Sequence, residues 1–431
     1  MREIIFIVLL VITIVIFFYS ISRIIAFFKL TKPAYPVKEF GKRIKLTITN
    51  AFFQERIFRN PIAGFMHAIV FWGFCVILIG SIEIVIDGVS GLERSLGFLG
   101  VFYDIIMALG DISAYVIALF IVIFIIRRAF LDIPRLHGKE LSDKNHKDAY
   151  LALTFILILM VSLAGVNIFY VLMHGNDANF VGRYPVSDII SPVFAGLSYE
   201  TMHIIHEINW WAHIVLIFIF ANVLPYSKHF HIFMSIPNVF FSRLTPLGKL
   251  ANMESVTKEV KMMLNPETTY SADANQSAEI SRFGILDAED FTWKNYIDSL
   301  ACTQCGRCTS VCPANITGKE LSPRKLFIEI RKRMKEKAPH LIKDKNFSDN
   351  KSFIREYIKE EEIWACTTCN ACAKECPLNI DHPAFIIDMR RYLAMEEGSA
   401  PAPINSIFAN IENNGAPWQY SNEDRLKWTE A

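Results

Sequence analysis

Hydrophobic residues dominate long stretches of the first half of the chain, and this pattern ends near residue 234. Five of the apolar runs are long enough to cross a bilayer, for which a helix needs about 20 mostly apolar residues. They span Ile4–Phe28, Pro61–Ile86, Val101–Ile126, Tyr150–Met173 and His203–Tyr226. Charged residues and prolines return beyond residue 234. The pattern predicts an all-α protein with a five-helix transmembrane bundle over residues 1–234, followed by a mainly α-helical domain.

Basic residues are distributed unevenly between the apolar runs. Eight Lys or Arg residues lie between the first and second runs and six between the third and fourth, whereas the other two connections hold one each, Arg94 and Arg183. By the positive-inside rule the two basic connections are cytoplasmic. The first run is too long for a signal-peptide core and no small-residue cleavage site follows it, so we expect a retained helix. These features predict a multi-pass protein of the cytoplasmic (inner) membrane, with its N-terminus outside and its polar half in the cytoplasm.

Eight of the nine cysteines lie in the polar half, in two copies of one spacing. The run C-x2-C-x2-C-x3-C-P occupies Cys302 to Pro313 and returns at Cys366 to Pro377. It is the ligand pattern of a two-cluster ferredoxin, in which the fourth Cys of each run ligates the other [4Fe–4S] cluster. We therefore expect one cluster on Cys302, Cys305, Cys308 and Cys376, and a second on Cys366, Cys369, Cys372 and Cys312.

Disulfides and zinc are the alternatives for these cysteines. Disulfide-rich domains are small and secreted, which does not suit repeated quartets within a large membrane protein. Zinc sites use paired C-x-x-C units rather than an unbroken triplet with a fourth Cys before Pro. Thiolate clusters also require a reducing compartment, which agrees with the distribution of basic residues. The ninth cysteine, Cys75, lies in an apolar run and is expected to be a packing residue.

Histidines within membrane spans are costly and indicate function. His67 lies near the cytoplasmic end of the second span, and His231 lies just beyond the cytoplasmic end of the fifth. Because a neutral imidazole is a common axial ligand of haem iron, these two are predicted to bind one haem b. His213 precedes His231 by 18 residues, which is five turns of a straight helix, so both would point to one side and His229 to the other.

A second haem on His213 is left open by the sequence. The second span offers no other histidine at a suitable depth, and His174 and His206 are the candidates toward the outside. Either residue could instead belong to a quinone site or to the surface. Each of these histidines has an alternative role as an interfacial or hydrogen-bonded residue.

The fifth-span stretch from Trp210 to His231, with its two histidines 18 residues apart, resembles the haem b subunit of membrane-bound nitrate reductases. The twin cysteine runs resemble the corresponding domain of heterodisulfide reductase. The resemblance implies paired haem ligands on the second and fifth helices, quinol oxidation, and exchange of electrons with a soluble partner. Longer relatives of this kind continue into cysteine-rich C-C-G domains, and no cysteine follows Cys376 here. The resemblance thus implies that the catalytic end lies on another chain or was lost.

The remaining polar residues suggest three further segments. Residues 235–281 are expected to hold an interfacial helix and a linker, with a polar loop over Thr268–Ser281. The cluster domain is assigned to residues 282–398, and residues 399–431 to an extended C-terminal tail. Helices within the cluster domain are predicted at Ser322–Lys337, Lys343–Glu362 and Asp381–Glu397.

Net charge and motifs exclude several functions. The 431 residues carry a formal net charge of +1, which gives no argument for nucleic-acid binding. The sequence holds no phosphate-binding glycine loop, nucleophile elbow or dinucleotide fingerprint. We therefore predict an oxidoreductase subunit that passes electrons between the quinone pool, haem b and two [4Fe–4S] clusters, to or from a cytoplasmic redox subunit or carrier. No catalytic residue is assigned. The alternatives are a membrane-anchored structural or sensory protein with zinc or clusters, and the anchor of a disulfide-reducing enzyme.

Overall fold

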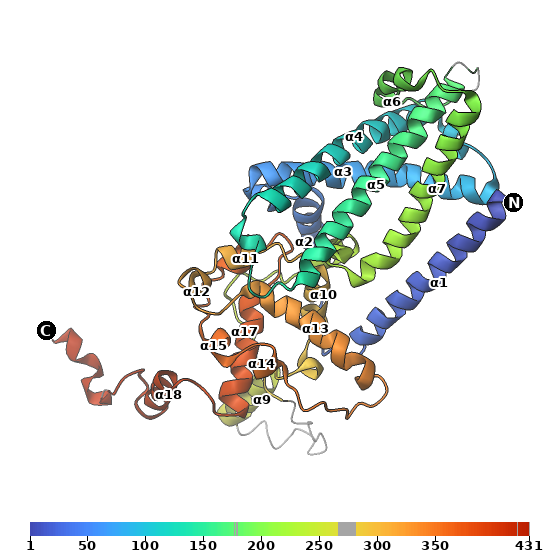
Figure 1. Cartoon of the computed structure of the whole chain (residues 1–431). Coiled ribbons are helices and arrows are strands. Elements are labelled where there is room, and N and C mark those ends of the chain that lie inside the picture. Colours follow the sequence, from blue (N-terminus) through green and yellow to red (C-terminus); the bar gives the residue numbers. More distant parts are fainter. Residues whose placement is uncertain (176, 178–179, 266–281, 420, 431) are drawn as a thin grey trace.

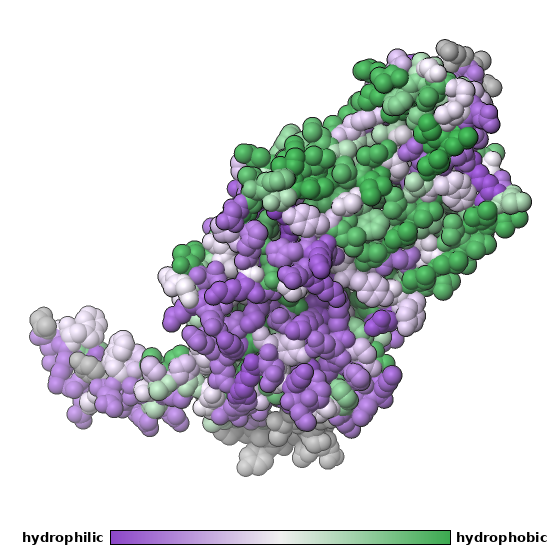
Figure 2. Space-filling model, viewed as in Figure 1, coloured by the Kyte–Doolittle hydropathy of each residue, from purple (hydrophilic) through white to green (hydrophobic). Residues whose placement is uncertain are grey.

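The computed structural model describes residues 1–175, 177, 180–265, 282–419 and 421–430, and it shows two joined parts (Figure 1). A bundle of long helices forms one part, and a domain of shorter helices covers one end of it. On the face shown in Figure 2, the surface of the bundle is mostly hydrophobic, whereas that of the smaller domain is mostly hydrophilic. Within the described residues the regular elements are helices, and β-pairing is limited to two isolated bridges.

Five helices are long and apolar enough to cross a membrane, which confirms the predicted spans. Each extends a few residues beyond its apolar run, because polar residues continue the helix outside the hydrophobic stretch. They are α1 (Arg2–Phe28), α3 (Pro61–Ser90), α4 (Val101–Phe130), α5 (Asp143–His174) and α7 (Tyr199–Val223), the last prolonged to Tyr226 by the 3-10 turn η6.

The bundle packs in chain order, with α3 against α4, α4 against α5 and α5 against α7, while α1 lies across α3 and α7. Phe6 of α1 is fully buried between Trp210 and Phe218, with ring centroids 5.8 and 5.7 Å away. Its ring occupies the space that a side chain at Gly88 would need, since an added Cβ would lie 2.5 Å from it. Glycine at this position therefore permits the close approach of α1 to α3.

The chain does not run straight from His213 to His231. Helix α7 ends at Val223, and two 3-10 turns, η6 (Leu224–Tyr226) and η7 (Lys228–Phe230), separate it from α8 (His231–Phe240). Pro225 cannot donate a helical hydrogen bond, and the Ser227 hydroxyl accepts from the backbone N–H of His229. The prediction of five straight turns is therefore wrong, and so is the inference that His229 points away, because the His229 and His231 rings lie 5.8 Å apart.

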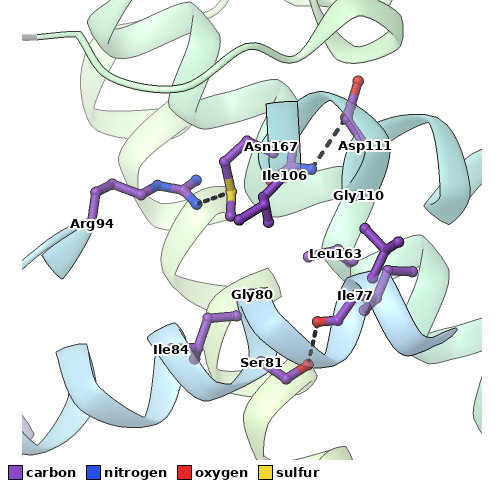
Figure 3. A pocket seen from close by; sticks show the side chains of 12 residues that line it. Ile77, Gly80, Ser81, Ile84, Arg94, Ile106, Gly110, Asp111, Leu163 and Asn167 are labelled. Carbon is purple, nitrogen blue, oxygen red and sulfur yellow. Dashed lines mark hydrogen bonds between the residues drawn. The ribbon is translucent and has the colours of Figure 1, made fainter. Parts of the chain in front are cut away.

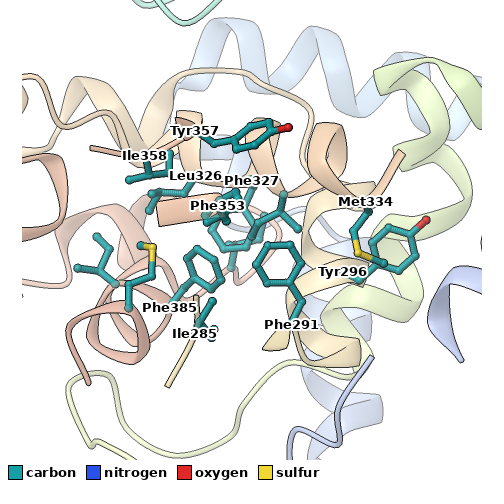
Figure 4. Close-up of a cluster of buried hydrophobic side chains, with 14 of the residues drawn as sticks. Ile285, Phe291, Tyr296, Leu326, Phe327, Met334, Phe353, Tyr357, Ile358 and Phe385 are labelled. Atoms are coloured by element: carbon teal, nitrogen blue, oxygen red, sulfur yellow. The ribbon is translucent and has the colours of Figure 1, made fainter. Parts of the chain in front are cut away.

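The smaller domain is built around a cluster of buried aromatic and aliphatic side chains (Figure 4). Phe291, Phe327, Phe353 and Phe385 are each at most 1% exposed and contact one another edge-on or tilted. The helices that supply and surround this core are α10 (Trp293–Ala301), α11 (Arg307–Ser310), α12 (Pro313–Ile316), α13 (Pro323–Leu341), α14 (Phe353–Glu356), α15 (Glu360–Trp364), α16 (Ala371–Glu375), α17 (His382–Arg391) and the π-turn η10 (Tyr392–Glu396).

Two of the three helices predicted in this domain are present. Helix α13 covers the predicted Ser322–Lys337, and α17 with η10 covers most of Asp381–Glu397. The predicted helix over Lys343–Glu362 is wrong, since this segment is a loop followed by the short helices α14 and α15. Asn350 and Arg355 have positive φ angles of 57° and 82°, which a continuous right-handed helix excludes.

The segments outside these two parts differ from expectation in one respect. Helix α9 (Glu254–Leu264) lies at the end of the smaller domain away from the bundle (Figure 1), and the predicted loop Thr268–Ser281 lies outside the described residues. The tail beyond residue 399 is not extended throughout, because Ala402–Asn414 forms helix α18 and Asn422–Thr429 forms the 3-10 turn η11. Figure 1 shows this tail projecting away from the molecule.

The two parts are docked rather than merely connected. The aromatic core of the smaller domain continues into Phe27 of α1 and Phe230 of η7, both nearly fully buried. Lys32, just after α1, forms a parallel bridge with Thr292 through hydrogen bonds of 2.9 and 3.0 Å, and its ammonium group lies 2.7 Å from Asp290. We call this contact the Lys32 strap. It fixes the exit of the first membrane helix to the smaller domain.

Candidate iron–sulfur and haem centres

The two cysteine runs adopt the same backbone conformation. In the first run Gln304 and Gly306 have positive φ angles of 58° and 75°, and in the second the equivalent residues, Thr368 and Asn370, have 53° and 61°. Each run then enters a short helix, α11 or α16, and these two helices pack against each other. The repeat in sequence is therefore a repeat in structure.

The structure gathers the first thiol set, Cys302, Cys305, Cys308 and Cys376. Burial is the main cause that raises the pKa of the Cys376 thiol to about 12, and the thiol charges that add to it are those of Cys305 and Cys302. Burial likewise raises the pKa of Cys308 well above its usual value, with further contributions from Cys305, Cys302 and Cys376 and a smaller one from Cys372 of the other run. The last cysteine of the second run thus lies with the first three of the first run.

The second thiol set, Cys366, Cys369, Cys372 and Cys312, shows the reciprocal arrangement. Burial raises the pKa of the Cys372 thiol, followed by the charges of Cys366 and Cys312. Cys312 also acts on Cys366, whose pKa is raised in the same way. Cys369 is exposed, whereas Cys312 and Cys372 are buried. The second thiol set is therefore exposed to solvent at Cys369.

The donor chemistry of both sets fits a bound iron–sulfur cluster. Buried thiolates that repel one another need nearby positive charge, which bound iron supplies while it deprotonates its thiol ligands. In the part of the chain that the structure describes, no three His, Cys, Asp or Glu side chains meet as the ligands of a single metal ion would. A cubane places each thiolate on a different iron, so its ligands do not need to meet at one point.

His67 and His231 lie near each other at the end of the bundle that the smaller domain covers. The two imidazoles lie within electrostatic range of each other. His67 Nδ1 lies 3.0 Å from Oε1 of Gln54, a buried residue, and His231 Nδ1 lies 3.1 Å from the Lys228 carbonyl. Because a carbonyl oxygen can only accept, each Nδ1 donates and each Nε2 is left to bind another group. This anchoring is typical of ligand histidines.

His213 lies deeper in the bundle and has the same kind of anchor. It is 2% exposed, and its Nδ1 lies 3.0 Å from both the Leu159 carbonyl and the Ser162 hydroxyl. Its Nε2 is buried without a hydrogen-bond partner. An acceptor nitrogen left unpaired in an apolar interior is costly, and a bound metal would satisfy it. The chemistry of His213 therefore fits an axial ligand.

The two candidate partners of His213 lie elsewhere, at the far end of the bundle. His174 Nδ1 lies 2.9 Å from the Asp177 carboxylate, and His206 has Arg94 and Arg2 among its charged neighbours. Within the described residues, neither candidate is therefore brought to His213. It places His174 and His206 with the polar network of the far end.

Polar residues within the spans that the sequence interpretation missed form this far-end network (Figure 3). Asp111, fully buried, accepts hydrogen bonds from Asn167, from the Ser187 hydroxyl and from two backbone N–H groups. With Arg94 and Ser81 it lines a pocket between α3, α4 and α5. A buried carboxylate in an apolar run is itself a functional or structural indication, and Asp111 could have been found by that criterion.

Comparisons with known proteins agree with the cysteine pattern. Residues 301–380 match the 4Fe-4S dicluster domain. The chain is 28% identical to the probable iron-sulfur-binding oxidoreductase FadF of Bacillus subtilis, over 96% of this chain and 58% of the relative. It is 27% identical to the EtfAB:quinone oxidoreductase of Syntrophomonas wolfei, over 90% of this chain and 54% of the relative. A probable membrane-anchored ferredoxin of Chromohalobacter salexigens is 35% identical over 34% of this chain and 24% of the relative.

The first two relatives are longer than this chain. The chain spans a little over half the length of the first two relatives. Shorter matches, over 24% of the chain, include heterodisulfide reductase polypeptides of Methanosarcina acetivorans and Methanosarcina mazei. No solved structure matches the chain. The predictions of a 4Fe–4S dicluster domain, of a membrane protein and of an oxidoreductase in the general sense are confirmed.

Proposed function

We propose that the chain is a membrane-anchored subunit that passes electrons between the quinone pool and a cytoplasmic redox partner, through haem b and two [4Fe–4S] clusters. The observation that carries this proposal is that Arg307 links the first cysteine run to the surroundings of His67. Arg307, next to Cys308, donates to the carbonyls of Arg56 and Ile57, and its charge acts on His67. One residue thus contacts the cluster loop and the surroundings of the histidine pair.

His67 and His231 would hold the haem through their Nε2 atoms, and His213 would supply one ligand of a second haem. A bound haem would supply one-electron chemistry at a potential that its axial ligands tune. The residues of the chain supply the rest of the site. Gln54 and the Lys228 carbonyl orient the two imidazoles.

Two similarities support the quinone as the membrane substrate. The stretch from Trp210 to His231 resembles the haem b subunit of nitrate reductases, and one relative is named for its quinone oxidoreductase activity. The cytoplasmic partner would be a redox subunit or carrier, for which a chain with C-C-G domains is one candidate. Exposed Cys369 marks the position at which the second thiol set approaches solvent.

The decisive experiment replaces His67 by Ala, which would remove a proposed haem ligand without changing a cysteine. Both clusters should assemble, haem content should fall, and quinol should no longer reduce the clusters, whereas dithionite still should. Absorption and paramagnetic resonance spectra of the purified protein report each of these results. His203→Ala is the matched control, because His203 is exposed at the far end of the same bundle. Normal haem content and quinol-dependent reduction in His67→Ala would contradict the proposal.

The proposed orientation places the smaller domain in the cytoplasm and the N-terminus outside. The two basic connections lie at the end of the bundle that carries this domain, since Arg56 and Arg135 contact its cysteine loops. An accessibility reporter inserted after Gly175 should therefore label from outside intact cells, and one inserted after His137 should not. The opposite labelling pattern would reverse the orientation and leave the cluster ligands unaffected.

A second candidate function is the anchor of a disulfide-reducing enzyme, which the similarity to heterodisulfide reductases favours. This second function uses the same cofactors as the first and differs in the redox partner that exchanges electrons with the clusters. Transfer of electrons from the reduced clusters to a disulfide-reducing chain, and not to another redox carrier, would favour this candidate.

A further inference from the structure

Two arginines from separate membrane connections converge on the first thiol set. Arg56, between η1 (Ile48–Phe52) and η2 (Ile57–Arg59), donates to the carbonyls of Cys376 at 3.0 Å and Ala373 at 3.4 Å. Arg135, in the turn η4 (Pro134–Leu136), donates to the Cys305 carbonyl at 3.3 Å. The loop at Gly306 fits tightly against this turn, because an added Cβ would lie 2.4 Å from the Arg135 carbonyl.

The charges of both arginines act directly on thiols of this set. Burial is the main cause that lowers the pKa of Arg56, and the Cys376 thiolate is the strongest opposing influence. For Arg135 burial again lowers the pKa, and the Cys305 thiolate opposes it. Since both guanidinium groups are partly removed from water, their fields are less screened than those of surface charges.

Neighbouring carboxylates reduce the contribution of other cations. Arg324 lies 2.6 Å from the buried Glu140 carboxylate, and Arg307 lies 3.8 Å from Glu375. Glu375 and Glu55 also act on Arg56, but the hydrogen bonds of Arg56 and Arg135 given above are to backbone carbonyls. Arg331 and Lys228 act on Cys302 as well. Of the cations near this set, Arg56 and Arg135 are the two that donate to carbonyls of its cysteines.

The second thiol set has a cation of a different origin. Arg390, on α17, donates to the carbonyls of Cys366 at 2.6 Å and Ile363 at 2.8 Å, and its guanidinium group lies over the Trp364 ring. Both Arg390 and its partners belong to the smaller domain. The cation that contacts the second set thus belongs to the same domain as its cysteines, whereas Arg56 and Arg135, which contact the first set, belong to the membrane connections.

We propose that Arg56 and Arg135 raise the reduction potential of the first cluster, so that docking of the membrane domain sets this potential while that of the second cluster is set by Arg390. The inference rests on the thiol sets proposed above. Reduction adds one electron to the oxidised cluster, with no bond broken and no proton taken up, so the cluster becomes more negative by one charge. A fixed cation nearby stabilises that product, and charge near the cluster is one of the factors that set its potential.

The test is a redox titration of the full-length, cluster-loaded protein, followed by paramagnetic resonance with dithionite as reductant. In Arg56→Gln and Arg135→Gln the midpoint potential of the first cluster should shift to lower values, more so in the double variant, and that of the second should stay unchanged. Arg390→Gln should show the reverse selectivity. The first cluster is identified as the signal lost in Cys376→Ser.

Two further variants separate charge from structure. Arg56→Lys and Arg135→Lys keep the cation and lose the guanidinium fork, so the first midpoint potential should stay near that of the wild type, with unchanged iron per chain. Arg59→Gln removes a partly exposed cation that is paired with Glu375, and it should shift neither midpoint potential. Equal shifts in the midpoint potentials of both clusters would overturn the proposal. So would a decrease of the first midpoint potential in the Lys variants as large as that in the Gln variants. Because dithionite bypasses haem and quinone, failure of quinol oxidation would leave this result intact.

Discussion

The two ends of the membrane bundle both bury charged side chains, but they satisfy them in different ways. At the far end Glu83, 1% exposed, accepts from the Tyr103 hydroxyl and the Leu96 N–H, each at 3.0 Å. Arg94 lies 3.9 Å from the same carboxylate. At the other end Arg324 of the smaller domain, 1% exposed, pairs with Glu140 of a membrane connection and donates to the Arg135 carbonyl at 2.6 Å.

The difference lies in where the partners come from. The far-end network joins the ends of neighbouring membrane helices and the turns between them, so the bundle can form it alone. The cluster-side contacts join residues of the two parts of the molecule and leave groups on both sides unsatisfied if the parts separate. A buried ion pair adds little net stability, but removing one partner leaves an uncompensated charge and costs about 3–5 kcal/mol. The cluster end therefore ties the folding of the membrane bundle to that of the redox domain.

The largest expected effect comes from the cluster ligands. Cys376→Ser should abolish the cluster on Cys302, Cys305 and Cys308 and keep the other, and Cys312→Ser should do the opposite. The reason is the reciprocal grouping of the thiols across the two runs. Paramagnetic resonance and iron analysis of each variant check this prediction. Loss of the cluster within the same run would show that the ligands are not exchanged.

A smaller effect is expected when the ion pair between the two parts is broken. Arg324→Ala removes the cationic partner of Glu140, 7% exposed, and leaves it the hydrogen bond from Ser322. This variant should lower the free energy of unfolding by about 3–5 kcal/mol. The matched far-end variant, Arg94→Ala, should cost about 1–2 kcal/mol, because Glu83 keeps two hydrogen bonds. Urea unfolding in detergent micelles measures both. Equal losses in the two variants would show that the two ends of the bundle do not differ in this way.

The smallest expected effect is a dependence on pH at the cluster end. Hydrogen bonds from Ser322 and Arg324, with the charge of Arg324, hold the pKa of Glu140 below its usual value despite burial. A carboxylate with a lowered folded pKa stabilises the protein above its unfolded pKa of about 4.3, and this stability is lost as the pH falls through the folded value. Glu140→Gln should therefore flatten the loss of stability below about pH 4. If the stability of Glu140→Gln fell below pH 4 as steeply as that of the wild type, other groups would control the loss of stability in acid.

The membrane helices and the cysteine runs could be predicted because each is encoded locally. Length and apolarity are sufficient for spans such as Pro61–Ser90, and the spacing from Cys302 to Cys312 fixes a known ligand pattern. The predicted helix over Lys343–Glu362 failed because its charges suit a helix while Asn350 and Arg355 adopt positive φ angles. That conformation is set by tertiary contacts, such as the hydrogen bond from the Ile354 N–H to the Leu286 carbonyl.

The contacts that carry the redox interpretation could not be predicted, because they join residues distant in sequence. The distribution of basic residues predicted only that Arg56 and Arg135 are loop charges on the cytoplasmic side. Their partners, the carbonyls of Cys376 and Cys305, lie 320 and 170 residues away. The proximity of His67 to His231 was predicted from depth alone, although the straight helix invoked beside it does not exist.

The Lys32 strap can form only after most of the chain has been synthesised. Lys32 and its partner Asp290 are separated by 258 residues, so at a synthesis rate of about 5–20 residues per second the partner emerges roughly 13–50 s later. During that interval the first helix is already available for membrane insertion while its exit segment has no partner. The ribosome therefore delivers the membrane anchor first and the segment that closes the strap second. Loading of iron into the completed domain would come last, beside a bilayer that already holds the chain.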